Sequence, residues 1–253
     1  EIDGVFVCQS CGTKYSVEEA KKMMVEGTVD VQGTVKVDTS DELKNLYEIA
    51  RRAKDSDNNE NAAKYYDMIL IKDPSSWEAN FYTVYYSAMS CKIAEISIAA
   101  DKVANCLKST FDLVKTNLHG EDYEKAIDDI VTHSENISKM LGNAAISQYR
   151  SIDSEVRYQF TSEYMNHVFS AANIMFALGD DLEIIDKETH KELIQNVWRS
   201  GIDMLTLGIN ACSIFDISKS KTNLKNIANT YEQKIASLNP NYIAQTHTTG
   251  GCV

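Results

Sequence analysis

Proline and glycine are scarce in this 253-residue sequence, which contains 2 prolines and 11 glycines. Both residues interrupt helices, because proline lacks a backbone N–H and glycine costs about 1 kcal/mol of helix propensity relative to alanine. A chain with so few of them can form long helices. Since 43% of the residues are hydrophobic, the chain can also bury a sizeable core. The composition therefore favours a globular fold built of long helices.

The sequence also lacks a long hydrophobic run and an excess of positive charge. The longest apolar run, residues 168–178, includes Ser170 and Asn173 and is shorter than the about 20 residues that span a bilayer. The net charge is −12, which argues against a general nucleic-acid surface, because phosphate binding needs clustered Lys and Arg. The six cysteines form no regular disulfide framework, and no signal peptide is visible. These features predict a cytoplasmic protein that does not bind membranes.

Signatures of catalysis are missing as well. The sequence has no phosphate-binding glycine loop, no GxSxG and no HExxH, and its five histidines show no ligand spacing. The acidic pairs Asp128-Asp129 and Asp180-Asp181, together with His133, are interpreted as solvated surface groups, because charged side chains are mostly exposed. The sequence thus predicts a non-enzymatic protein. An enzyme whose site assembles from scattered residues is the alternative.

Residues 43–76, LKNLYEIARRAKDSDNNENAAKYYDMILIKDPSS, carry the clearest pattern in the chain. Apolar residues recur at spacings of three and four on both sides of the polar run 55–59, which predicts two helices joined by a turn. Asp73-Pro74 is expected to end the second helix. The apolar positions are Leu46, Ile49, Ala50 and Ala53 in the first helix, and Ala62, Tyr65, Tyr66, Ile69 and Leu70 in the second.

This order of residues resembles a tetratricopeptide repeat, a unit of about 34 residues with two helices and a tight turn. Leu46 stands where Trp is usual, and no Gly marks the turn. Ser75 with Glu78 predicts a capped third helix up to residue 89, similar to the start of a second, degenerate repeat. After residue 89 the repeat signature fades.

The resemblance implies a concave face that binds peptides, on the side of the first helix opposite Leu46. The residues expected to line this groove are Lys44, Tyr47, Arg51, Lys54, Tyr82 and Tyr85. Its basic side chains would attract an acidic segment or a carboxylate terminus. The alternative is that these side chains are ordinary solvated groups or are covered by later helices. Tyr82 and Tyr85 also belong to an aromatic cluster whose spacing favours the core, with Tyr65, Tyr66, Phe81 and Tyr86.

Five further amphipathic helices are predicted from apolar stripes at residues 93–118, 123–144, 156–175, 193–215 and 224–238. Gly120 and Gly179 are expected to end helices, whereas Gly201 and Gly208 lie on a buried stripe and should permit close helix approach. The predicted fold class is all-α, with a tetratricopeptide-like hairpin continued by a long-helix bundle. This helical domain covers residues 39–240, and a disordered tail is expected at 241–253.

The N-terminal segment contains Cys8-Gln9-Ser10-Cys11-Gly12, a CxxC followed by Gly, which resembles one knuckle of a zinc ribbon. Structural zinc takes about four ligands, so Cys8 and Cys11 provide half a site. The other knuckle is expected upstream of residue 1, so zinc is expected in a longer protein rather than complete in this chain. Free thiols, or a zinc shared within a homodimer, are the alternatives. Residues 1–27 would form the half ribbon and a short helix starting at Ser16, and residues 28–38 an extended linker.

The chain as a whole is similar to uncharacterised bacterial proteins that join a zinc ribbon to a tetratricopeptide-like helical region. The resemblance implies a cytoplasmic, non-enzymatic binding or scaffold protein that presents a helical groove to a protein or peptide partner. A zinc-ribbon module for nucleic acid or transcription is the alternative, and the acidic charge speaks against it.

Overall fold

The computed structural model describes residues 5–7, 14–16, 40–212 and 219–247. Contacts divide the chain into two units, Glu1–Asp41 and Glu42–Val253. In the first unit, β1 (Val5–Val7) pairs antiparallel with β2 (Lys14–Ser16), and Phe6 lies opposite Tyr15. The Cys8 and Cys11 pair, the helix expected after Ser16 and the linker at 28–38 lie outside the described residues.

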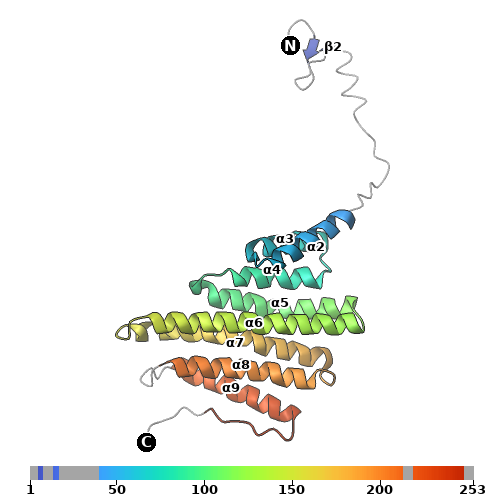
Figure 1. Cartoon of the computed structure of the whole chain (residues 1–253). Helices are drawn as coiled ribbons and strands as arrows, with labels where there is room; N and C mark the ends of the chain where they lie inside the picture. The colour runs from blue at the N-terminus through green and yellow to red at the C-terminus, as the bar shows by residue number, and fades with distance from the viewer. Residues whose placement is uncertain (1–4, 8–13, 17–39, 213–218, 248–253) are drawn as a thin grey trace, which may run out of the picture. The chain divides into compact units, whose positions relative to one another are not determined.

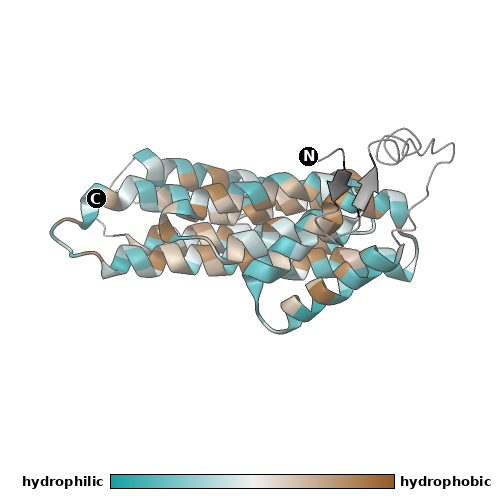
Figure 2. Ribbon diagram, turned by 90° about the horizontal axis from the view of Figure 1, so that it is seen from above, coloured by the Kyte–Doolittle hydropathy of each residue, from teal (hydrophilic) through white to brown (hydrophobic). Residues whose placement is uncertain are grey.

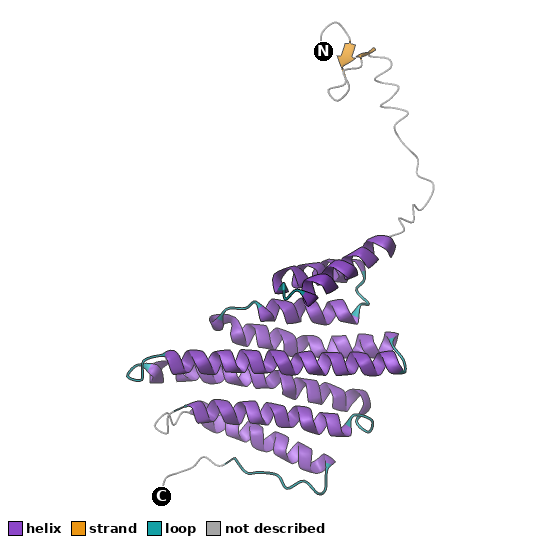
Figure 3. Ribbon diagram, viewed as in Figure 1, coloured by secondary structure: helices purple, strands orange, loops and turns teal. Residues whose placement is uncertain are grey.

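The second unit is helical, which confirms the predicted all-α fold class (Figures 1 and 3). The short 3-10 helices η1 (Ile93–Glu95) and η2 (Arg157–Phe160) precede α5 and α7. The α-helices are α2 (Ser40–Asp55), α3 (Asn59–Lys72), α4 (Trp77–Met89), α5 (Ile96–Asn117), α6 (Glu121–Ser151), α7 (Thr161–Asp186), α8 (Lys191–Ala211) and α9 (Lys219–Leu238). No described helix is both long enough and apolar enough to cross a membrane.

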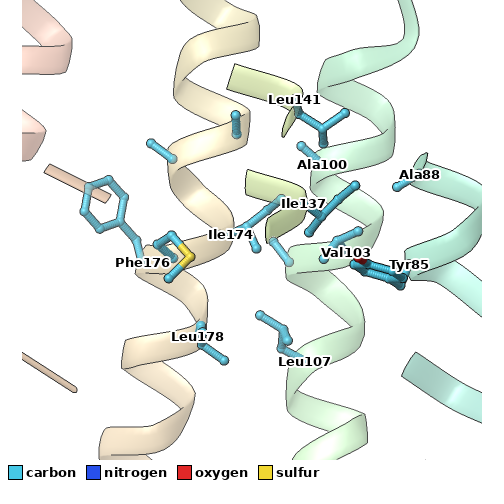
Figure 4. Packing of buried hydrophobic residues seen from close by; sticks show 14 of the residues in the cluster. Tyr85, Ala88, Ala100, Val103, Leu107, Ile137, Leu141, Ile174, Phe176 and Leu178 are labelled. Atoms are coloured by element: carbon cyan, nitrogen blue, oxygen red, sulfur yellow. The ribbon is translucent and has the colours of Figure 1, made fainter. Parts of the chain in front are cut away.

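The helices from α3 onward form a row in which α3, α4, α5, α7, α8 and α9 contact one another in turn. Helix α6 packs against one side of this row, with its axis roughly along those of α5 and α7, and contacts α4, α5, α7 and α8 (Figure 1). Hydrophobic residues follow the helix faces that meet, and hydrophilic residues cover the outside (Figure 2). In Figure 4 the side chains that meet at the centre come from α5, α6 and α7: Val103, Leu107, Ile137, Leu141, Ile174 and Leu178.

Helices α2 and α3 form on either side of the turn, as the apolar pattern of residues 43–76 predicts. Its small residues and the large side chain of Tyr66 are buried, whereas Ile49 is exposed. The turn needs no glycine, because Asp57 takes the left-handed conformation (φ 54°) and Asn58 caps α3 by accepting a hydrogen bond from the Asn61 N–H. The expected cap of α4 was one residue off. Ser76 Oγ, not Ser75, accepts from the Ala79 N–H (3.0 Å).

Close packing of α7 and α8 depends on glycines, as predicted for Gly201 and Gly208. A Cβ on Gly201 would lie 2.6 Å from Cε1 of Phe176, and one on Gly208 would overlap Val168. The expectation that Gly179 ends a helix was wrong. Helix α7 runs on to Asp186, and Gly179 is needed because the Trp198 indole occupies the place of its Cβ. Gly120, at φ +59°, does separate α5 from α6.

The expected disordered tail was wrong for residues 241–247. This segment, named the C-terminal strap here, lies against α9, because Asn229 and Glu232 bind its backbone and side chains. Figure 3 draws it as the loop after α9. Residues 248–253 lie outside the described part of the chain.

Candidate functional site

Three of the predicted groove residues join α2 to α4. The Tyr47 hydroxyl donates to Ser76 Oγ (2.5 Å), and Lys54 Nζ donates to the Tyr82 hydroxyl (2.7 Å). Arg51 binds both carboxylate oxygens of Glu78, at 2.8 and 3.2 Å. These contacts define an α2–α4 junction. Of the predicted basic groove residues, Lys44 and Arg51 are exposed, and Lys54 is partly buried.

Tyr82 and Tyr85 do not line an open groove, so that part of the prediction was wrong. Tyr82 and Tyr85 are 1% and 6% exposed, because both rings pack among the aromatic side chains of α3 and α4. The Tyr82 ring stacks on Tyr66 with centroids 5.1 Å apart and on Tyr86 at 5.4 Å. The burial agrees with the other interpretation of these residues, as members of an aromatic core.

Glu78 is the centre of the polar contacts at this junction. Besides Arg51, its carboxylate accepts a hydrogen bond from the buried Tyr66 hydroxyl (2.8 Å). The hydrogen bond to Glu78 raises the pKa of Arg51, and burial raises the pKa of Tyr66. The positive charge of Arg51 is therefore already balanced by Glu78 within the fold.

A second carboxylate, Asp129 on α6, binds the same junction from the other side. The Tyr82 hydroxyl donates to Asp129 Oδ2 (2.5 Å), and His133 Nδ1 lies 3.2 Å from Oδ1. Burial raises the pKa of Asp129, but the hydrogen bonds from His133 and Tyr82 and the charge of Lys54 outweigh it and lower the pKa. Interpreting Asp129 and His133 as solvated surface groups was wrong, because they complete an interhelical network.

The acidic pair on α7 also differs from its expected solvated state. Asp180 accepts hydrogen bonds from Trp198 Nε1 (3.0 Å), the Tyr231 hydroxyl (2.9 Å) and Lys234 Nζ (2.6 Å), so it links α7 to α8 and α9. Burial, with the adjacent charge of Asp180, raises the pKa of Asp181 to about 6. The three hydrogen bonds of Asp180 therefore stabilise the packing of α7 against α8 and α9.

An apolar cleft of about 530 Å³ lies where η1, the end of α6, η2 and the start of α7 meet. We name it the η2 cleft. Its rim carries three large apolar side chains, Ile93, Val156 and Phe160, that are 40–42% exposed. The buried rings of Tyr149 and Tyr164 form its floor, and Glu163 and His167 form a polar edge. The cleft thus combines an apolar interior with few polar groups, as ligand sites do.

The floor of the η2 cleft is fixed in place by the scaffold. The Tyr149 and Tyr164 rings stack with centroids 4.1 Å apart. Tyr149 hydrogen-bonds Thr161 Oγ1 (2.8 Å), and the Tyr164 hydroxyl donates to the Gly208 carbonyl (2.7 Å). Because both hydroxyls are used within the fold, the two tyrosines offer apolar ring surface to the cleft.

The rim is anchored by Arg157 of η2. Its guanidinium donates to the carbonyls of Ile152 (2.7 and 3.0 Å) and Arg150 (3.0 Å) and lies 5.8 Å from the Tyr149 ring centroid. These bonds satisfy the carbonyls at the end of α6 and hold the connection to η2. The cleft is therefore preformed, which reduces the entropy lost on binding.

His167 contributes an imidazole to the polar edge. Burial lowers the pKa of His167, and the nearby Glu163 charge opposes this only in part. Ser97 Oγ accepts from Asn166 Nδ2 (3.0 Å) and lies 2.8 Å from His167 Nδ1. If the Ser97 hydroxyl donates to Nδ1, the ring hydrogen sits on Nε2, which faces Glu163 Oε1 at 3.8 Å. This edge then offers one N–H donor and one carboxylate.

Sequence reasoning missed the η2 cleft. Val156 and Phe160 were assigned to the buried stripe of a regular helix, whereas the chain forms the 3-10 helix η2 and exposes both. The polar run Asp153-Ser154-Glu155 before them was the available signal for a break. Ile93, the third rim residue, lies too far away in sequence for any local pattern to pair it with Val156 and Phe160.

The chain matches no family model, no curated protein and no solved structure. Among the described residues, no group of three or more His, Cys, Asp or Glu side chains is placed to hold a metal ion. Cys8 and Cys11 fall outside that part, so the zinc-ribbon interpretation stays a prediction from sequence.

Proposed function

We propose that this chain is a non-enzymatic binding protein whose η2 cleft takes an apolar side chain of a protein partner. The observation that carries the proposal is the preformed apolar cleft with Ile93, Val156 and Phe160 exposed together on its rim. Single exposed apolar residues are common on protein surfaces, but a group around a concave site is typical of an interaction surface.

The polar edge gives the partner a further requirement. Glu163 is exposed beside the cleft and carries a negative charge, and its neighbour His167 is buried. A Lys or Arg next to the apolar anchor would meet Glu163, and the net charge of −12 would favour approach of a basic segment. The preferred partner is therefore a segment that combines a large apolar side chain with a basic residue.

The α2 face is a weaker candidate for the same role. The tetratricopeptide-like resemblance favours it, but Arg51 pairs with Glu78, and Lys54 with Tyr82. A partner there would have to break contacts that join α2 to α4. A partner at the η2 cleft covers side chains that are already accessible.

A peptide selection against the whole chain tests this function. We expect it to enrich segments with an apolar anchor and a basic residue, and Val156→Asp or Phe160→Asp to weaken their binding about tenfold or more. Ile184→Asp, on an exposed position of α7 away from the cleft, is the matched control and should leave affinity unchanged. If no peptide is enriched, or if both rim variants bind like the control, the proposed site is wrong.

A further inference from the structure

A second hollow lies beside the η2 cleft, between the starts of α7 and α9. It has a volume of about 680 Å³, and we name it the α7–α9 groove. Its apolar lining is formed by Met165, Phe169, Leu224 and Ile227, and its polar lining by Gln159, Ser162, Asn166, Ser220 and Asn223. Glu163 lines both this groove and the η2 cleft, so the two sites meet at that side chain.

The helical period of α7 explains why Glu163 separates the two sites. Tyr164 and His167 share the face toward the η2 cleft, and Ser162 and Asn166 share the face toward the groove. Glu163 lies between these faces. A helix with its side chains is about 10–12 Å across, and an extended chain rises about 3.3 Å per residue. A peptide that crosses α7 from one site to the other therefore needs about three to four residues.

Glu163 also supplies the charge that such a peptide would meet. Among the described residues that line the two sites, it is the only Asp, Glu, Lys or Arg. Its side chain is 61% exposed, so the carboxylate is accessible from both sites. A Lys or Arg in the middle of the peptide fits this position, whereas an acidic residue would be repelled.

The polar lining of the groove consists, apart from Glu163, of neutral amides and hydroxyls. Within the described part of the chain, no hydrogen bond joins the side chains of Ser162 and Asn223 to another residue. A side-chain amide has a donor and an acceptor, so it can pair with both backbone groups of an extended segment. Asn229 of the same helix binds the strap in this way, since it accepts from the His247 N–H (2.8 Å) and donates to the His247 carbonyl (3.4 Å). The groove thus offers Asn223 for backbone and an apolar surface for a side chain.

We propose that the partner segment of the η2 cleft crosses Glu163 and places a second apolar side chain in the α7–α9 groove, where Asn223 binds its backbone. This inference rests on the proposed function of the cleft and specifies the partner further. The partner is an extended protein segment with two apolar side chains about three to four residues apart and a basic residue between them. One short segment reaches both sites because they meet at a single residue of α7.

Parallel peptide selections against the wild-type chain, Asn223→Tyr and Asn226→Tyr test the inference. Asn223→Tyr places a ring in the groove, whereas Asn226→Tyr, the matched control, changes an exposed residue of α9 outside it. Wild type and control should enrich a second apolar position about three to four residues from the anchor. Asn223→Tyr should keep the anchor and the basic residue and lose the second position.

The possible outcomes separate this inference from the function of the cleft. Peptides with an anchor but no second apolar position, or the same enrichment by all three forms, overturn the inference and leave the function of the cleft standing. No enrichment by any form overturns both.

Isothermal titration with a selected peptide gives a second test. Changing its second apolar residue to Ala should weaken binding to the wild-type chain about fivefold or more and leave binding to Asn223→Tyr unchanged. Phe160→Asp should weaken binding of both peptides, because both keep the anchor in the cleft. Equal losses on the wild-type chain and Asn223→Tyr would mean that the second side chain binds outside the groove, which contradicts the inference.

Discussion

The α2–α4 junction and the η2 cleft use similar residue types for opposite purposes. At the junction, Tyr82 and Glu78 form contacts that hold helices together. At the cleft, the hydroxyls of Tyr149 and Tyr164 form hydrogen bonds with Thr161 and the Gly208 carbonyl. Their rings line the cleft together with Phe160. A tyrosine or charged residue on a predicted helix therefore does not indicate a binding surface until its hydrogen-bond partners in the fold are known.

The largest expected effect follows from the aromatic packing at the junction. Tyr82→Ala should lower the free energy of unfolding by about 3–5 kcal/mol, because it leaves a cavity and removes a partner of Asp129. Phe160→Ala, on the cleft rim, should cost about 1 kcal/mol or less, because the residue is already 42% exposed. Urea unfolding of both variants measures the difference. Equal losses would mean that the rim, too, is part of the core.

A smaller effect is expected from the carboxylates of the two regions. Glu78→Ala should destabilise by about 1–3 kcal/mol, because the buried Tyr66 hydroxyl loses its acceptor and Arg51 its partner. Glu163→Ala, the matched change at the cleft, should stay within about 0.5 kcal/mol. Thermal and urea unfolding of the two variants would show similar losses if the Glu78 contacts were merely surface pairs.

Asp181 is a half-buried carboxylate whose pKa is raised. Since its folded pKa of about 6 exceeds its ordinary value, the folded state favours the protonated form, and stability is lost as pH rises through about 6. Asp181→Asn mimics the protonated form. It should raise the free energy of unfolding by about 1–2 kcal/mol at pH 7 and by little near pH 4. A variant whose stability differs from wild type equally at both pH values would contradict this sign.

The smallest effect is expected at Lys44, an exposed basic residue of the predicted groove. Lys44→Ala should change the free energy of unfolding by less than about 0.5 kcal/mol. It should also leave binding of a selected peptide unchanged. A loss of affinity comparable with that of a rim variant would indicate that the peptide binds at the α2 face.

Local patterns predicted the helices well because burial and helix period act within one segment. The apolar stripe of residues 43–72, the stop at Pro74 and the close approach at Gly201 and Gly208 all follow from such local rules. The pattern was less reliable for Gly179. A side chain is excluded there by the Trp198 ring, which comes from another helix.

The sites were harder to predict because they depend on partners distant in the sequence. Asp129 and Tyr82 lie 47 positions apart, and Asp180 and Lys234 lie 54 apart. A carboxylate that will be solvated and one that will accept buried hydrogen bonds look the same along the chain. Disorder was expected for the strap for a similar reason. The sequence does not show that Glu232 of α9 accepts a hydrogen bond from Tyr242.

The affinity of a selected peptide for Phe160→Asp and for Arg51→Glu tests the central claim most directly. Isothermal titration of both variants of the chain should give about a tenfold or greater rise in Kd for Phe160→Asp and less than about a twofold change for Arg51→Glu. Unchanged binding by Phe160→Asp together with lost binding by Arg51→Glu would contradict the account and assign the partner to the α2 face.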